Sequence, residues 1–266
     1  MSNAVQRAAV PAGDPRDLTG RVAIITGAGQ GIGREYALAF AAAGAVPVIA
    51  EINFENAKKV ERTITETGGR ALAVQLDVTD PAACTKMVET VSRAFGRVDV
   101  LINNAAVFST LKKAPFDEIP LADWDHVLRV NVNGPYYCVR AVAPAMRAAQ
   151  WGRIINIATS SIGTGTPNYL HYVTSKSALL GMTNSLAREL GKFNITVNTI
   201  VPGSTMTEVP REGFDAQSLA HVVARQCIPR AETPQDIVGL ALFLASPSAG
   251  FVTGQAIAVN GGITHS

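Results

Sequence analysis

A tyrosine and a lysine, Tyr172 and Lys176, stand four residues apart at the start of an apolar helical stretch. Residues at positions i and i+4 share one face of a helix, with their Cβ atoms about 5–6 Å apart. An ammonium held that close stabilises a phenolate, which predicts a tyrosine pKa lowered from about 10 towards neutrality. Such a phenol could exchange a proton with an alcohol or a carbonyl near pH 7. The alternative is a half-exposed tyrosine beside a solvated lysine without a catalytic role. Other motifs in the sequence are needed to choose between the two interpretations.

A glycine-rich segment, TGAGQGIG at residues 26–33, lies between a β-branched run and a helical pattern. Glycines let the backbone turn tightly and approach a pyrophosphate, whose charge rests on the N–H groups of the helix N-terminus. The spacing differs from the common GxGxxG, and similar turns also occur for packing alone. Its place after a buried strand nevertheless predicts a dinucleotide site formed by Gly27, Gln30, Gly31, Ile32 and Gly33.

Two acids follow the next two predicted strands. Glu51 lies close to the roughly 20-residue offset at which an acid binds the ribose hydroxyls of NAD. Its carboxylate would repel the 2′-phosphate of NADP, and no arginine or lysine stands at Gln30, Ile52 or Asn53 to receive that phosphate. The sequence therefore favours NAD over NADP, with a solvated strand-end glutamate as the alternative. Asp77 could reach the adenine amine or simply cap the following helix.

Short β-branched runs alternate with longer helical patterns, which is typical of βαβ units and a parallel sheet covered on both faces. The predicted strands cover residues 21–26, 46–50, 71–76, 98–102, 153–158, 195–201 and 256–259. After the helix that follows the glycine-rich segment through residue 43, the predicted helices cover residues 53–67, 81–95, 121–149, 168–191 and 234–245. Gly134-Pro135 predicts a kink or a close approach inside the longest helix. Residues 202–220 are predicted to form a mobile loop with short helical pieces.

The composition predicts one α/β domain at residues 18–266 behind a flexible tail at residues 1–17. The tail lacks the hydrophobic segment of a secretory signal. A net charge of +2 without a dense basic run argues against a nucleic-acid or anionic membrane partner. No apolar run reaches the roughly 18 residues of a membrane span. The three cysteines and four histidines are scattered, which predicts no metal site and a reducing, cytoplasmic location.

Several motifs in this order resemble the short-chain dehydrogenase/reductase family: the turn at residues 26–33, Asp77, NNAA at residues 103–106, Asn131, and YVTSK from Tyr172 to Lys176. The match spans residues 18–262. The resemblance implies a Rossmann-type, doubly wound parallel sheet of seven strands in the order 3-2-1-4-5-6-7. It also implies a homotetramer that packs the tyrosine-bearing helices together.

The resemblance implies a catalytic role for individual residues. Tyr172 corresponds to the general acid/base, and Lys176 to the lysine that lowers its pKa and holds the nicotinamide ribose. Asn131 corresponds to the asparagine that anchors a proton-relaying water. The family places its substrate-binding serine thirteen residues before the tyrosine, where this chain has Thr159 followed by Ser160. Either hydroxyl can donate to a carbonyl oxygen, and the spacing favours Thr159.

The resemblance also assigns cofactor contacts. The segment that grips the carboxamide corresponds to Pro202, Gly203, Thr205 and Thr207. Asn104 and Ala105 are expected against the adenosine ribose, and Val78 beside the adenine. The family usually has a glycine where this chain has Ala106, which puts a methyl group where bare backbone is common.

These implications predict reversible hydride transfer between NAD and a secondary alcohol or its ketone, a small-molecule substrate. The cofactor supplies the hydride chemistry, while the protein supplies position and pKa. The alternatives are an NADPH-dependent 3-oxoacyl reductase, a non-catalytic NAD-binding protein and a nucleotide-sugar epimerase. The substrate pocket is expected at residues 107–113, 162–169 and 205–226, where an apolar or aromatic alcohol is indicated by Phe108, Tyr169, Met206 and Phe214.

Overall fold

The computed structural model describes residues 17–265 of the chain, so residues 1–16 of the predicted tail lie outside the described residues. Within them, seven parallel strands form one sheet in the order β3-β2-β1-β4-β5-β6-β7. The strand order implied by the family resemblance is therefore confirmed. The strands are β1 (Val22–Thr26), β2 (Val46–Glu51), β3 (Leu72–Gln75), β4 (Val100–Asn103), β5 (Gly152–Ile157), β6 (Ile195–Pro202) and β7 (Ala256–Val259).

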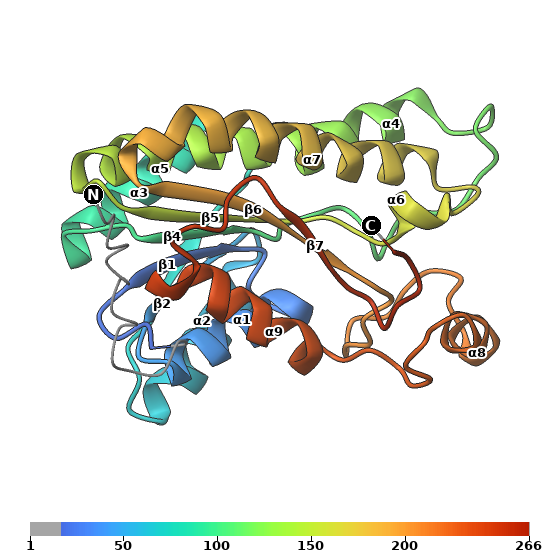
Figure 1. Cartoon of the computed structure of the whole chain (residues 1–266), viewed down its shortest axis with the longest axis horizontal. Coiled ribbons are helices and arrows are strands. Elements are labelled where there is room, and N and C mark those ends of the chain that lie inside the picture. Colours follow the sequence, from blue (N-terminus) through green and yellow to red (C-terminus); the bar gives the residue numbers. More distant parts are fainter. Residues whose placement is uncertain (1–16, 266) are drawn as a thin grey trace, which may run out of the picture.

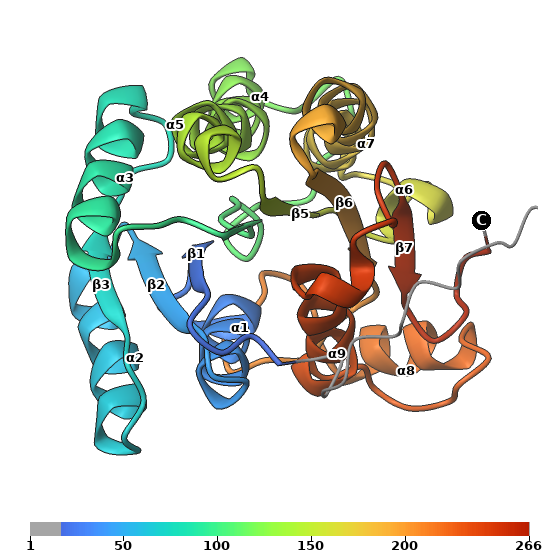
Figure 2. The same cartoon turned by 60° about the vertical axis from the view of Figure 1, so that its left-hand side comes forward.

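Helices cover both faces of the sheet (Figures 1 and 2). One face packs against α1 (Gly31–Ala42), α2 (Phe54–Glu66) and α9 (Pro234–Ala245). The other packs against α3 (Pro81–Phe95), α5 (Gly134–Ala149) and α7 (Leu170–Leu190). Successive strand residues point to opposite faces, so Ile24 joins the second core and Ile25 the first. This two-sided burial explains the near-continuous apolar strands.

Local signals in the sequence set the bounds of two helices at the predicted residues. α3 begins at Pro81 after Asp80, whose side chain accepts a hydrogen bond from the Ala82 N–H at 2.8 Å. It ends at Gly96, which adopts a left-handed conformation with φ of 74°. α9 begins at Pro234 with a capping box. Proline at the first helical position and glycine just past the end suit these places because of their backbone preferences.

The predicted helix at residues 121–149 is wrong as a single helix. The structure divides it into α4 (Leu121–Leu128), a π-helical turn η1 (Arg129–Asn133) and α5. The close approach expected at Gly134 is confirmed, because a Cβ atom there would lie 2.8 Å from Val78 Cγ2. Single π turns within helices often occur at functional sites, and η1 contains Asn131.

The structure agrees with a helical piece inside the loop predicted at residues 202–220, but the bounds of the loop differ. β6 extends to Pro202, and the helix α8 (Ala216–Ala224) begins after Asp215, whose carboxylate accepts from the Ser218 N–H at 2.8 Å. Only residues 203–215 form a loop, which we call the β6–α8 loop. The remaining helical segments are α6 (Ser161–Thr164), η2 (Gly191–Phe193) and η3 (Pro247–Ala249). Among residues 17–265, no helix is both long and apolar enough to cross a membrane.

Candidate active site

A cavity of about 1070 Å³ lies where the strands end at their carboxyl termini and the β6–α8 loop begins. Parallel sheets bind ligands at this edge. Its wall contains residues from both the glycine-rich turn and α7, which are far apart in the sequence. Of the predicted site residues, those in the wall are Gly27, Gln30, Gly31, Ile32, Gly33, Glu51, Asp77, Val78, Asn104, Ala105, Thr159, Ser160, Tyr172, Lys176, Pro202, Gly203, Thr205 and Thr207.

The glycine-rich turn connects β1 to α1. Gly27 has a positive φ of 64°, and a Cβ atom there would lie 2.9 Å from the Ala105 backbone. A Cβ atom on Gly33 would collide with the Gly27 carbonyl oxygen and come within 2.6 Å of Asn104 Nδ2. That Asn104 amide donates to the Thr26 and Gly27 carbonyl oxygens at 2.9 and 3.1 Å. Asn104 therefore braces the turn, and the turn tolerates no side chain at these two glycines.

Two N–H groups of the turn bind carboxylates of the chain itself. Gly29 N donates to Glu51 Oε2 at 3.0 Å, and Gly31 N donates to Glu208 Oε1 at 2.9 Å. Glu208 comes from the β6–α8 loop and also pairs with Arg34 at 3.1 Å. The positive end of a helix dipole attracts negative charge. The turn is therefore an anion-binding site, and the sequence analysis did not identify Glu208 as one of its ligands.

The two predicted acids are held differently. The buried Glu51 accepts from Gly29 N through Oε2 and from Asn53 N through Oε1 at 3.1 Å, so its carboxylate is fixed. The exposed Asp77 accepts from both the N–H and the hydroxyl of Thr79 at 2.8 Å. The alternative that Asp77 caps α3 is wrong, because Asp80 occupies that position.

Tyr172 and Lys176 are both buried in the wall of the cavity on α7, with 6% and 3% of their surface exposed. Lys176 Nζ donates to the Ile157 carbonyl oxygen, at the end of β5, at 2.7 Å. Burial disfavours the charged ammonium and lowers the pKa of Lys176 to about 8. The half-exposed pair considered from the sequence is therefore wrong, since both side chains are enclosed.

The pKa expected for Tyr172 is also wrong for the chain by itself. Burial raises the pKa of the Tyr172 phenol well above its usual value. A hydrogen bond with Thr159 and the positive charge of Arg211 act against this increase. The four-residue spacing places Lys176 on the correct helical face, but it does not reveal how strongly the surroundings exclude water. In this site desolvation outweighs the positive charge of Arg211.

Asn131 lies behind the cavity wall and is completely buried. Its Oδ1 accepts from Val107 N at 2.8 Å, and its Nδ2 donates to the Val107 carbonyl oxygen at 3.3 Å and to Ser175 Oγ at 3.1 Å. Asn131 therefore fastens the segment after β4 to the helix that carries Tyr172. Its expected part in a proton relay stays a prediction.

Thr159 and Ser160 both line the cavity just after β5. Thr159 Oγ1 accepts from Ser161 N at 3.2 Å and, unlike Ser160, is a hydrogen-bond partner that lowers the Tyr172 pKa. The Ser160 N–H donates to the Pro202 carbonyl oxygen at 2.8 Å. The threonine is thus the hydroxyl that lies beside the phenol. Of the four apolar residues expected in the pocket, Phe108, Tyr169 and Phe214 line the cavity, whereas Met206 does not.

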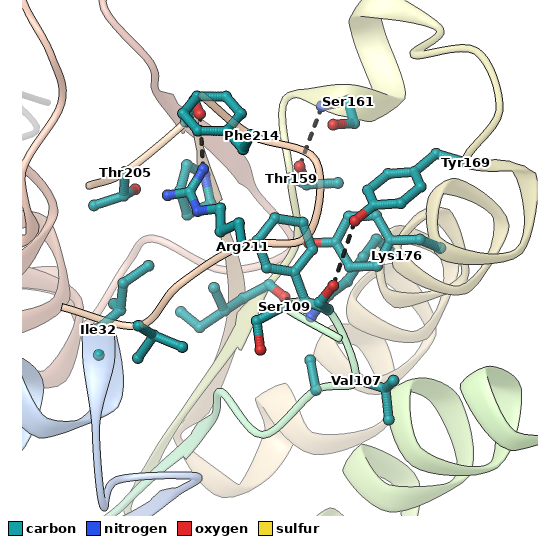
Figure 3. A pocket seen from close by; sticks show the side chains of 18 of the residues that line it. Ile32, Val107, Ser109, Thr159, Ser161, Tyr169, Lys176, Thr205, Arg211 and Phe214 are labelled. Carbon is teal, nitrogen blue, oxygen red and sulfur yellow. Dashed lines mark hydrogen bonds between the residues drawn. The ribbon is translucent and has the colours of Figure 1, made fainter. Parts of the chain in front are cut away.

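Arg211 is a cavity residue to which the sequence analysis gave no role. Its guanidinium lies 5.5 Å from the Phe108 ring centroid and 5.0 Å from that of Phe214, and it donates to Ser204 Oγ at 2.8 Å. Figure 3 shows Arg211 beside Phe214, across the cavity from Tyr169. A signal was present in the sequence, because Arg211 is the single lysine or arginine of the β6–α8 loop.

Glu232, just before α9, was also missed. It is buried and accepts from Thr205 Oγ1 at 2.7 Å and from Gly203 N at 2.9 Å. Burial raises the pKa of its carboxyl to about 7. Glu232 therefore fixes the segment that was expected to grip a carboxamide. Its place before a helix-starting proline carries no signal of this long-range contact.

No group of three or more histidine, cysteine or acidic side chains within residues 17–265 is arranged to hold a metal ion.

Residues 27–264 match the family model described as Enoyl-(Acyl carrier protein) reductase. The chain is 36% identical over 245 residues to the 7alpha-hydroxysteroid dehydrogenase of Escherichia coli strain K12, covering 92% of this chain and 94% of that enzyme.

Two solved structures have the same fold over almost the whole chain. A protein from Sinorhizobium meliloti 1021, provisionally assigned as a short-chain alcohol dehydrogenase, has a TM-score of 0.88 at 34% identity and covers 94% and 98% of the two chains. A protein from Beutenbergia cavernae, provisionally assigned as an NAD(P) dependent gluconate 5-dehydrogenase and described with bound NADP at low occupancy, has a TM-score of 0.86 at 37% identity and covers 94% and 99%. With its parallel sheet, glycine-rich turn and tyrosine–lysine pair, the chain therefore belongs to the short-chain dehydrogenase/reductase family.

Proposed function

We propose that this protein transfers a hydride between NAD(H) and a secondary alcohol or its ketone. The observation that carries the proposal is the enclosure of Tyr172 and Lys176 in the same cavity wall as the glycine-rich turn. A phenol that can exchange a proton thereby lies within one cavity with an anion-binding helix N-terminus. Relatives that are dehydrogenases support an oxidoreductase acting on alcohol-type substrates.

The residues at the nucleotide end fit a dinucleotide. The N–H groups of the turn already bind carboxylates, so they are suited to a pyrophosphate. The nicotinamide, when bound, supplies the hydride chemistry. We assign Asp77 and Val78 to the adenine, and Asn104 with Ala105 to the adjacent ribose. The carboxamide is assigned to the segment that Glu232 fixes, with Pro202, Gly203, Thr205 and Thr207.

The preference for NAD over NADP rests on Glu51. Its carboxylate is buried and held by two backbone N–H groups, so it cannot easily move away from a 2′-phosphate. Two negative charges at such a distance repel each other, and the repulsion grows as water is excluded. A relative from Beutenbergia cavernae is described with bound NADP, so the preference of this protein for NAD must be measured directly.

In the proposed mechanism Tyr172 exchanges the proton of the substrate oxygen. The raised pKa keeps its phenol protonated at neutral pH, which suits proton donation to a ketone during reduction. Thr159, beside the phenol, steadies the same oxygen, and Ser160 is the second hydroxyl within this part of the wall. Lys176 holds a proton at Nζ, while Asn131 fixes the helix through Ser175. Alcohol oxidation is therefore expected to accelerate as pH rises.

The direct test is a panel of secondary alcohols, sugars and hydroxy acids assayed with NAD and with NADP by the absorbance of the reduced nicotinamide. The proposal predicts turnover of at least one secondary alcohol, with a higher kcat/KM for NAD. Activity confined to NADPH and 3-oxoacyl substrates would favour the reductase alternative. Tight NADH binding without turnover of any panel member would favour a binding protein and contradict the proposal.

We also propose a homotetramer in the cytosol. The family resemblance implies association through α7, on which Leu170 is 45% exposed. The cysteines Cys84, Cys138 and Cys227 carry free thiols, which suits a reducing compartment. Light scattering should give a mass four times the 27.9 kDa of one chain, and a monomer would contradict the assembly.

A further inference from the structure

We propose that Arg211 binds a carboxylate of the substrate, so that the physiological substrate is a hydroxy acid or oxo acid with an apolar body. This inference rests on the proposed hydride transfer and names the substrate class for it. Three features of the cavity lead to it: the confinement of the guanidinium, its lack of an ion-pair partner, and its position relative to Tyr172.

Aromatic rings confine the Arg211 guanidinium. It lies close to the rings of Phe108 and Phe214, and one of its nitrogens donates to Ser204 Oγ. Contact with an aromatic ring uses the flat face of a guanidinium and leaves its N–H groups at the edge available. The fork of N–H donors on a guanidinium matches the two oxygens of a carboxylate. The side chain is therefore pre-arranged to accept a planar anion.

Arg211 lacks a carboxylate partner within residues 17–265. The ion pairs of this part of the chain join other arginines and lysines to acids. The acid that acts on Arg211 electrostatically, Glu232, directs both oxygens to Gly203 N and Thr205 Oγ1. A half-buried cation without a counter-charge is costly, and burial lowers the pKa of Arg211. An anionic ligand would supply the missing charge.

Phe108 connects Arg211 to the proposed catalytic tyrosine. Its ring centroid lies 4.9 Å from that of Tyr172 and 5.5 Å from the Arg211 guanidinium. Tyr169 adds a third ring, 5.2 Å from Tyr172. A substrate whose hydroxyl reaches Tyr172 therefore needs only a short apolar spacer to bring a carboxylate to Arg211. The aromatic wall suits a phenyl or similar group carried beside that spacer.

The alternative is that Arg211 contacts the pyrophosphate of the cofactor. Other residues of the β6–α8 loop face the turn, since a Cβ atom on Gly31 would meet Val209 at 3.3 Å and Thr207 at 3.8 Å. Arg211 instead lies against Phe108 and is close enough to Tyr172 and Tyr169 to interact electrostatically with their phenolate forms. These contacts place the guanidinium at the substrate end of the cavity.

The test uses the full-length protein saturated with NADH and two probes that lack a hydroxyl, 3-phenylpropanoate and its neutral analogue 3-phenylpropanamide. Binding is measured by calorimetry. The wild-type complex should bind the carboxylate about 10- to 100-fold more tightly than the amide, as expected for a charge-assisted hydrogen bond. Arg211→Gln should remove this difference, and Arg211→Lys should retain part of it.

The matched control is Lys112→Gln, which removes a positive charge from an exposed neighbouring loop position outside the cavity wall. It should leave the carboxylate preference unchanged. NADH affinity and thermal melting verify that each variant is folded. Equal affinities of the wild type for the two probes would overturn the inference. A loss of NADH affinity in Arg211→Gln as large as the loss of carboxylate affinity would instead assign Arg211 to the cofactor and also overturn it.

A turnover experiment separates this inference from the proposed function. The pair 3-hydroxy-3-phenylpropanoate and 1-phenyl-1-propanol differs mainly by the carboxylate. Both proposals are supported if the wild type oxidises the acid preferentially, through a lower KM for the acid, and if Arg211→Gln raises that KM by about 10-fold or more. Equal oxidation of both alcohols, unaffected by Arg211→Gln, overturns the inference and leaves hydride transfer standing. Arg211-dependent carboxylate binding without oxidation of either alcohol or of any other panel member contradicts hydride transfer and supports the anion site.

Discussion

The two ends of the cavity are built from different parts of the polypeptide. At the nucleotide end, backbone N–H groups of Gly29 and Gly31 bind carboxylates, and Gly27 and Gly33 permit close contact between segments. At the substrate end, the contacts come from side chains on α7, on the segment after β4 and on the β6–α8 loop. Phe108 contacts both Tyr172 and Arg211 there, although Phe108 and Arg211 are 103 positions apart in the sequence.

This difference indicates which end of the cavity determines substrate specificity. A backbone site at strand ends depends on a few glycines and on the sheet order, so it can stay the same among relatives with different substrates. A side-chain site depends on loops, which vary more in sequence than the elements they connect. We therefore infer that the nucleotide end and Tyr172 together determine the class of reaction, while the loop side chains at the substrate end determine which molecule reacts. The predictions below alter one end at a time.

The largest effect is expected from Gly33→Ala at the nucleotide end. The added methyl group would collide with the Gly27 carbonyl oxygen and Asn104 Nδ2, so the turn must deform. NADH affinity, measured by fluorescence titration, should fall by about 100-fold or more, and stability by about 1–3 kcal/mol. The matched control is Gly239→Ala on α9, where a Cβ atom meets open space. Normal NADH binding by Gly33→Ala would contradict the proposal that the glycine-rich turn binds the cofactor.

Lys176 gives a pH-dependent test at the substrate end. Its pKa is lowered from 10.5 to about 8 by burial. Between these values the unfolded chain binds more protons than the folded one, so stability must rise with pH. The shift corresponds to about 3 kcal/mol, a cost fully present below pH 8 and relieved as pH approaches 10.5.

The measurement is urea unfolding of the wild type and Lys176→Met across this pH range. The wild type should gain up to about 3 kcal/mol relative to the variant between pH 8 and 10.5. The two proteins are compared by how their free energies of unfolding change with pH. The other groups that titrate in this range contribute equally to both proteins, and the hydrogen bond to Ile157 that the variant loses shifts the free energy without changing this slope. Parallel pH profiles for the two proteins would show that the amine is solvated and contradict the enclosed substrate end.

A smaller effect is expected for cofactor choice. Glu51→Gln removes the negative charge, keeps one acceptor oxygen and replaces the other with an NH2 donor. The ratio of kcat/KM for NADP over NAD should rise about 10-fold, which corresponds to about 1.4 kcal/mol of relieved repulsion. Asp77→Asn, at the next strand end, should change the ratio much less. An unchanged ratio in Glu51→Gln would remove Glu51 from the ribose site.

The smallest effect concerns the contact that links the two ends. Glu208, on the β6–α8 loop, occupies the Gly31 N–H that a pyrophosphate oxygen is expected to use. Glu208→Gln should therefore strengthen NADH binding by about two- to five-fold, because the competing contact is partly exposed and weak. Glu212→Gln, an exposed acid four residues along the same loop, serves as the control. Weaker NADH binding in Glu208→Gln would show that the carboxylate organises the turn.

The same contrast explains how far the sequence could be interpreted. Local rules identified elements whose signals lie within them, such as Pro81 after Asp80 and Gly96 at the end of α3. Spacing on a helix correctly placed Tyr172 and Lys176 in one cavity wall. Both acids at the strand ends, Glu51 and Asp77, lie in the cavity wall because strand ends meet at one edge of a parallel sheet.

What the sequence could not predict depends on tertiary packing. The π turn at Asn131 interrupts a continuous helical pattern, and α8 forms where the pattern was weak. Arg211 and Glu232 gain their roles from contacts with segments distant in the chain. The Tyr172 pKa moved opposite to expectation because desolvation depends on everything that surrounds the phenol, not on one neighbour along the helix.

The central claim is that the Tyr172 phenol, enclosed with a bound nicotinamide, exchanges the proton of the substrate oxygen. Tyr172→Phe removes only the hydroxyl from a buried ring. Comparing turnover with NADH binding in that variant is therefore the most direct test of this role of Tyr172. The account predicts that kcat falls by about 10²- to 10⁴-fold while the NADH dissociation constant stays within about two-fold of the wild-type value. Near wild-type turnover in Tyr172→Phe would contradict the account.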